Sequence, residues 1–127
     1  MIYADSNILI YLIEDPGERG DRVRRRFDEI DDELVVSPLV IMECRVKPLQ
    51  LGDLVTVRRF DRLFDHLPHL DMPEEVYLLA ADTRARHGLK TMDALHLATA
   101  QFHTCDGFWT QDDRLKAAAG GLAIETF

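Results

Sequence analysis

The sequence predicts an α/β protein, a three-layer α/β/α sandwich around a mostly parallel sheet of four or five strands. Short apolar runs alternate along the chain with longer segments of helical periodicity, which is the pattern of strand–helix–strand units. Residues that favour helix starts directly follow several of the apolar runs, so strands are expected to turn into helices at their carboxyl ends. With 127 residues, no internal repeat and no long linker, we expect one domain over residues 1–127.

The N-terminal half is expected to alternate between strand and helix. Val23, Phe27 and Ile30 share one face of a polar helix at spacings of four and three residues. Ser37 is expected to cap the next helix through its hydroxyl group, with Pro38 at the first helical position. We expect strands at residues 2–4 and 34–36, and helices at residues 8–13, 18–31, 39–48 and 54–67.

The C-terminal half repeats the alternation. Gly88 is expected to end one helix, and Thr91 to cap the next. Trp109 lies in an apolar run, so we expect it in the core rather than stacked on a base. We expect strands at residues 69–72, 108–110 and 122–124, and helices at residues 73–87 and 91–103, followed by a short helix that ends at residue 119.

The composition excludes several functional classes. Hydrophobic residues make up 46% of the chain, which argues against disorder. The net charge of −8 excludes a uniformly basic nucleic-acid binder, but it is compatible with a nuclease whose acids hold cations. The two cysteines lack metal-binding spacing, so we expect a reducing, cytoplasmic environment. We expect neither a signal peptide nor membrane association, because no basic leader and no long apolar run is present.

Four acidic residues are placed where a parallel sheet gathers its ligands. Asp5 and Asp112 follow predicted strands, Glu43 lies two turns into a helix, and Asp93 lies in the first turn of another. Each acid alone also has a structural explanation, such as a helix cap or a favourable interaction with a helix dipole. For Glu43 that explanation is a solvated helix face, but its segment is apolar on nearly all sides, so an acid there needs a partner. Together, the four carboxylates are the oxygen ligands that Mg²⁺ prefers.

Four motifs surround these acids: Asp5-Ser6-Asn7, Ser37 to Glu43, Gly88 to Ala100, and Thr110-Gln111-Asp112. They resemble the motifs of PIN-domain proteins, in the same order along the chain. The length and the lack of added domains look like the VapC-type toxins of toxin–antitoxin pairs. The resemblance implies a Mg²⁺- or Mn²⁺-dependent endoribonuclease in which a metal-activated water hydrolyses RNA phosphodiester bonds. It also implies a homodimer that a small cognate antitoxin inhibits.

The resemblance also assigns roles to individual residues. Asp113 adds a second acid beside Asp112, and the motif register favours Asp112. Gln111 stands where the family usually has asparagine. Supporting residues that orient carboxylates or waters would be Ser6, Asn7 and Thr110, with Asp113 as a further candidate. The catalytic and metal-binding acids would be Asp5, Glu43, Asp93 and Asp112.

Other polar residues have two explanations each. Lys90, with Arg84 and Arg86 before it, lies near Asp93 and is expected to contact the RNA backbone or to form a solvated helix end. We expect His96 to pack or to serve as a hydrogen-bond partner rather than as a general base. Two functional alternatives remain open: a non-cleaving PIN-like module that binds RNA or protein, and a related metal-dependent DNA nuclease or phosphatase.

Overall fold

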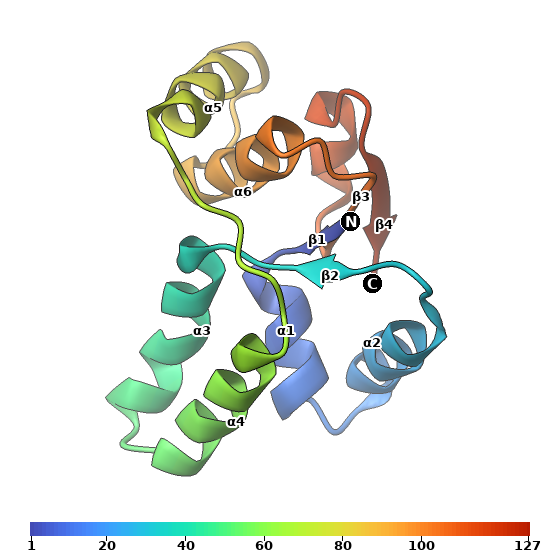
Figure 1. Ribbon diagram of the computed structural model, residues 1–127, viewed down its shortest axis with the longest axis vertical. Helices are drawn as coiled ribbons and strands as arrows, with labels where there is room; N and C mark the ends of the chain where they lie inside the picture. The colour runs from blue at the N-terminus through green and yellow to red at the C-terminus, as the bar shows by residue number, and fades with distance from the viewer.

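The computed structural model describes residues 1–127 and contains one four-stranded sheet (Figure 1). All strand pairs are parallel, and the strand order is β2-β1-β3-β4. The elements in chain order are β1 (Ile2–Ala4), α1 (Ser6–Glu14), α2 (Glu18–Glu29), β2 (Leu34–Val35), α3 (Pro38–Gln50), α4 (Leu54–Asp65), α5 (Glu74–His87), α6 (Thr91–Phe102), β3 (Gly107–Thr110), the 3₁₀ helix η1 (Asp113–Ala118) and β4 (Ala123–Thr126).

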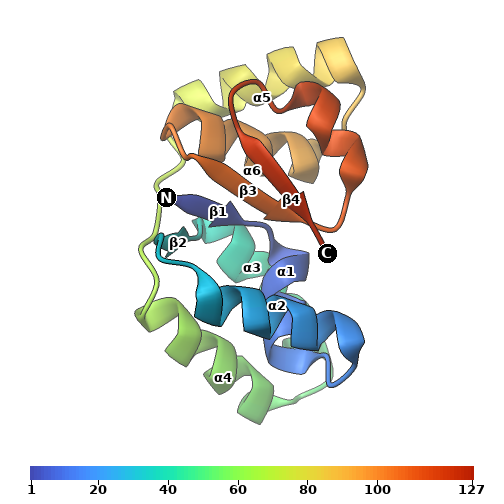
Figure 2. The ribbon, with the colours of Figure 1, turned by 90° about the vertical axis from the view of Figure 1, so that its right-hand side faces the viewer.

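Helices cover both faces of the sheet. Helices α5 and α6, together with η1, lie on one side, and α1 to α4 lie on the other (Figures 1 and 2). The predicted three-layer α/β/α architecture around a mostly parallel sheet of four or five strands is therefore confirmed, and the sheet has four strands, all parallel. None of the helices is both long and apolar enough to cross a membrane.

The register of the two central strands brings the first and last motifs together. Ala4 of β1 lies opposite Trp109 of β3, and the backbone N–H of Asp5 donates to the carbonyl oxygen of Trp109 at 3.1 Å. Because parallel strands end at the same edge of a sheet, the residues that follow each strand become neighbours. Asp5 and Thr110 meet in this way although 105 positions separate them along the chain.

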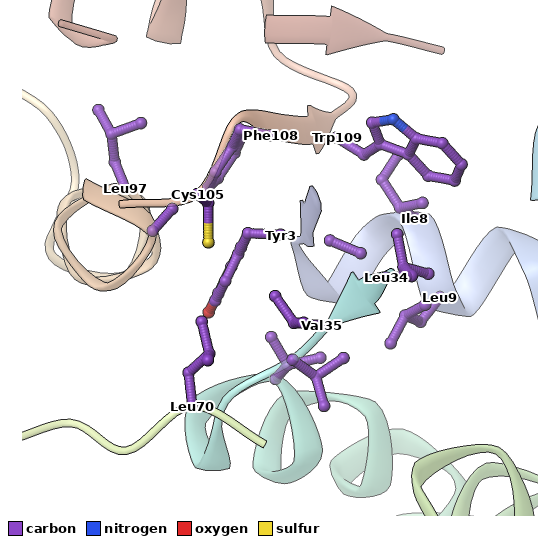
Figure 3. Packing of buried hydrophobic residues seen from close by; sticks show 14 of the residues in the cluster. Tyr3, Ile8, Leu9, Leu34, Val35, Leu70, Leu97, Cys105, Phe108 and Trp109 are labelled. Carbon is purple, nitrogen blue, oxygen red and sulfur yellow. The ribbon is translucent and has the colours of Figure 1, made fainter. Parts of the chain in front are cut away.

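Aromatic residues of β1 and β3 fill the core. The Tyr3 and Phe108 rings stack nearly parallel, with centroids 5.4 Å apart (Figure 3). Trp109 is buried, and its indole meets the Phe127 ring edge-on at 5.2 Å. The expectation that Trp109 belongs to the core is confirmed.

Element bounds differ from the sequence-based expectation by one or two residues at several places, among them α1, which begins at Ser6, and one expected strand is absent. Helix α3 continues past Pro48 to Gln50, because a proline so near the helix end removes only one backbone hydrogen bond. Residues 69–72 form no strand; His69 makes one isolated bridge with Val36. Prolines at positions 68 and 73 flank this segment and cannot donate to a ladder. The last strand lies at Ala123–Thr126, after the turn at Gly120 and Gly121.

Two expected helix caps are also wrong. Ser37 and Lys90 occupy the N-cap positions of α3 and α6, and neither side chain bonds the helix. Thr91 is instead the first residue of α6. The Ser37 hydroxyl is turned to a different partner, Tyr3. A hydroxyl that forms a buried side-chain hydrogen bond is no longer available as a cap.

Candidate active site

Asp5 lies at the junction of β1 and α1, and almost its entire surface is buried. Its Oδ1 accepts a hydrogen bond from the backbone N–H of Asn7 at 3.1 Å, and its Oδ2 accepts one from the Thr110 hydroxyl at 2.7 Å. Burial raises the pKa of the Asp5 carboxyl, and these hydrogen bonds offset that rise only in part. An ionised Asp5 is therefore incompletely compensated by the protein around it.

Glu43 projects from α3 toward α1 and α6, where it has two partners. Its Oε1 accepts a hydrogen bond from the Ser6 hydroxyl at 3.2 Å and is also bonded to Nε2 of the buried His96. Burial raises the pKa of the Glu43 carboxyl, but the interactions with His96 and Ser6 outweigh it and hold the pKa below its usual value. His96 is thus the partner that the Glu43 carboxylate needs within this apolar helix.

A hydrogen-bonded chain leads from Glu43 into the core. The His96 Nδ1 lies 2.7 Å from the Tyr3 hydroxyl, which in turn lies 2.7 Å from the Ser37 hydroxyl. Tyr3 and Ser37 are completely inaccessible to solvent. The expected role of His96 as a hydrogen-bond partner is confirmed, whereas sequence reasoning missed Tyr3 and Ser37. The available signal was a tyrosine in a buried strand, since its hydroxyl must find a partner there.

Asp93 and Asp112 line a common cavity of about 340 Å³, which lies between α6, η1 and the end of α5. Asp93 is half-buried, and burial together with the negative charge of Asp112 raises the pKa of its carboxyl. Lys90 and Arg114 act on Asp93 in the opposite direction. The other residues that line the cavity are His87, Gly88, Leu89, Lys90, Arg114 and Ala117.

Asp112 is held by a nearby arginine. The Arg114 guanidinium donates to both carboxylate oxygens, with Nε–Oδ1 and Nη2–Oδ2 distances of 2.9 and 2.7 Å. This interaction holds the pKa of Asp112 below its usual value. The backbone N–H of Asp112 also donates to the Thr110 hydroxyl at 3.2 Å. Because that hydroxyl donates to Asp5, Thr110 connects the first and the fourth acid.

The two neighbours of Asp112 point elsewhere. Asp113 is exposed, and its carboxylate pairs with Lys116 at 3.0 Å. Gln111 accepts a hydrogen bond from the Tyr11 hydroxyl of α1. Of this pair of acids, only Asp112 lines the cavity.

The structure brings the four acids to one edge of the sheet without closing them into one cluster. No three carboxylate, imidazole or thiolate groups lie close enough together to hold one metal ion. Mg²⁺ needs only one or two protein carboxylates, because waters and substrate phosphate complete its coordination. The donors are all hard carboxylate oxygens, and two of them, from Asp93 and Asp112, share a cavity. The residues present therefore fit Mg²⁺ or Mn²⁺ in their chemistry.

Several solved structures have a similar fold, and toxin–antitoxin complexes are among them. VapBC2 of Rickettsia felis, bound to a DNA fragment from its promoter, has a TM-score of 0.82 at 15% identity, covering 100% of this chain and 99% of that chain. A toxin–antitoxin complex from Klebsiella pneumoniae has a TM-score of 0.78 at 23% identity and covers 99% and 97%. VapC20 of Mycobacterium tuberculosis, a toxin that cleaves the sarcin–ricin loop, has a TM-score of 0.77 at 17% identity and covers 93% and 95%.

Sequence comparison identifies the family. No curated protein sequence matches the chain. The family model that describes the PIN domain matches residues 2–121, a range that includes Asp5, Glu43, Asp93 and Asp112. With almost its whole length matched, the chain belongs to the PIN domain family.

Proposed function

We propose that this protein is a metal-dependent endoribonuclease that hydrolyses RNA phosphodiester bonds and acts as the toxin of a type II toxin–antitoxin system. One observation supports this proposal above all. Two acids, Asp93 and Asp112, share a cavity with two cations, Lys90 and Arg114. The acids suit a divalent metal and the cations suit phosphate, so one cavity offers ligands for both parts of a nuclease reaction.

The four acids have different tasks in this proposal. Asp93 and Asp112 hold Mg²⁺ or Mn²⁺ in the cavity, while Asp5 and Glu43 add ligands or negative charge beside it. When bound, the metal lowers the pKa of a coordinated water and stabilises charge on the phosphate oxygens. Thr110 and Ser6 keep the carboxylates of Asp5 and Glu43 in fixed orientations through their hydroxyls.

The electrostatics of the acids favour a cation. Burial raises the pKa of both Asp5 and Asp93, so each carboxylate in its charged form lacks sufficient compensation. A bound divalent cation supplies that compensation. Two such ions would reduce the net charge of the chain from −8 to −4, with the entire change at the site. Binding of RNA should still depend strongly on salt, because Lys90 and Arg114 contact phosphates.

The proposed partners are a cognate antitoxin and a second copy of the chain. The similar structures from Rickettsia felis and Klebsiella pneumoniae are toxin–antitoxin complexes, which supports an antitoxin. Met42, Val46 and Leu49 form an exposed apolar stripe along α3, at spacings of four and three residues. Apolar side chains grouped in this way favour contact with another protein.

A substrate panel distinguishes this function from its alternatives. The purified chain is incubated in Mn²⁺ with single-stranded RNA, DNA of the same sequence, and p-nitrophenyl phosphate. We expect cleavage of RNA alone. Selective cleavage of DNA would indicate a DNA nuclease, and release of p-nitrophenol would indicate a phosphatase. Binding of RNA without cleavage would indicate a binding module.

Two aspartate variants serve as a matched pair in this assay. Asp93→Asn is expected to abolish cleavage because it removes a charge from the cavity. Asp113→Asn makes the same chemical change on an exposed residue outside the cavity, and its activity should equal that of the wild type. Equal activity in both variants would contradict the proposed site.

A further inference from the structure

Arg114 is the one arginine that lines the cavity with Asp93 and Asp112. Its guanidinium bonds both oxygens of Asp112, only two residues away along the chain. The Asp112 side chain is 21% exposed, whereas the Arg114 side chain is 77% exposed. The arginine thus covers an acid of the site from the solvent side and is not itself packed into the core.

This ion pair is easily exchanged. Because the Arg114 side chain is so exposed, water solvates the separated guanidinium well, and the pair costs less to break than a buried one would. The pair also connects two residues of the same turn, so it does not join distant parts of the fold. A divalent cation at Asp112 would therefore displace the guanidinium without disturbing the sheet or the helices.

The charges of the cavity indicate which kind of ligand the displaced arginine would bind. Without metal, the carboxylates of Asp93 and Asp112 balance the positive charges of Lys90 and Arg114. One bound Mg²⁺ or Mn²⁺ changes the summed formal charge of these four side chains from zero to +2. A cavity with that charge attracts a polyanion. The planar guanidinium binds a phosphate with the same two-pronged geometry that it uses on a carboxylate.

We propose that Arg114 exchanges partners during the reaction: it pairs with Asp112 when the metal is absent and binds an RNA phosphate once the metal occupies the acids. This inference rests on the proposed function and adds a substrate-binding residue to it. In this proposal, Arg114 has opposite effects on the binding of metal and on the binding of RNA. It competes with the metal for Asp112, and it strengthens binding of RNA.

The test measures both effects in Arg114→Ala. Mn²⁺ binding is followed through the melting temperature of the protein, and RNA cleavage is described by kcat and KM. Without the competing arginine, the Mn²⁺ concentration at half-saturation should fall about fivefold, a modest coupling between two sites. Without the phosphate contact, KM for RNA should rise about tenfold.

Lys116→Ala is the matched control. Lys116 lies on the same 3₁₀ helix and pairs with Asp113, so its loss changes the charge equally but outside the cavity. Neither Mn²⁺ binding nor KM should change in this variant. Arg114→Lys keeps the charge without the planar fork, and its KM should lie between those of the wild type and Arg114→Ala.

A lower Mn²⁺ concentration at half-saturation together with a higher KM for RNA supports the exchange. If Mn²⁺ and RNA both bind more weakly to Arg114→Ala, Arg114 has a structural role and the proposal is wrong. It is also wrong if Mn²⁺ binding stays unchanged, or if KM stays unchanged while Mn²⁺ binds more tightly. If the wild type cleaves no RNA, the proposed function fails; the Mn²⁺ titration and the anisotropy of labelled RNA in Mn²⁺ then still decide whether Arg114 exchanges partners.

Discussion

The Tyr3 hydroxyl offers a sharp test of the hydrogen-bonded chain behind Glu43. Tyr3→Phe keeps the ring that stacks on Phe108 and removes only the oxygen. That oxygen bonds both Ser37 and His96 at 2.7 Å, in a position that water does not reach. The substitution therefore leaves two polar groups without their partner in the interior, at no cost in apolar packing.

The size of the effect follows from these two contacts. A buried polar group that loses its partner costs about 1–3 kcal/mol, so the two together should cost about 3 kcal/mol of unfolding free energy. An unfolding entropy of about 2.1 cal/mol/K per residue, taken over the whole chain, converts this loss into a melting temperature lower by about 11 °C.

Calorimetry in the presence of a chelator measures the change without contributions from metal. Tyr77→Phe is the matched control, because Tyr77 is 51% exposed. A surface change of this kind should stay within about 0.5 kcal/mol, or about 2 °C. If Tyr3→Phe melts within that same interval of the wild type, the hydrogen-bonded chain does not stabilise the protein and this reasoning is refuted.

Three further predictions concern the acids and the metal. In chelator, Asp93 should contribute a negative slope to the stability of the wild type against pH, from pH 3.8 up through its folded-state pKa, because the raised pKa makes this group bind more protons in the folded state than in the unfolded state. Asp93→Asn should reduce that slope and raise the melting temperature at neutral pH; an unchanged slope in thermal melts would contradict the assigned environment. Mn²⁺ at a hundredfold excess over its dissociation constant should stabilise the wild type by about 2.7 kcal/mol, or about 10 °C, and no shift in millimolar Mn²⁺ would count against a metal site. Glu43→Gln should reduce this gain in a Mn²⁺ titration, whereas Glu14→Gln, on another helix, should retain it.

The sequence predicts the positions of the acids well because they depend on topology. Asp5 and Asp112 follow strands, and parallel strands bring their carboxyl ends to one edge. The contact between Asp5 and Thr110 is a direct consequence of that register. The need of Glu43 for a partner is also visible, since a charge within an apolar helix must be compensated.

Other features depend on which side chains meet in space. Nothing in the sequence indicates that the Ser37 hydroxyl would bond Tyr3, because the same residue before a proline is an ordinary helix cap. The role of Arg114 is hidden for a similar reason: an arginine two residues from an aspartate usually belongs to a solvated turn. Only the cavity that it shares with Asp93 supports the role that we propose for it.

End mapping of cleaved RNA tests the central claim most directly. The wild type and Asp93→Asn are incubated with one structured RNA in Mg²⁺, in Mn²⁺ and in chelator, and the fragment ends are determined. We predict 5′-phosphate and 3′-hydroxyl ends from the wild type with either metal, and no cleavage in chelator or by Asp93→Asn. Cleavage that persists in chelator, or that Asp93→Asn performs at the wild-type rate, would contradict the proposal that these acids form a metal-dependent nuclease site.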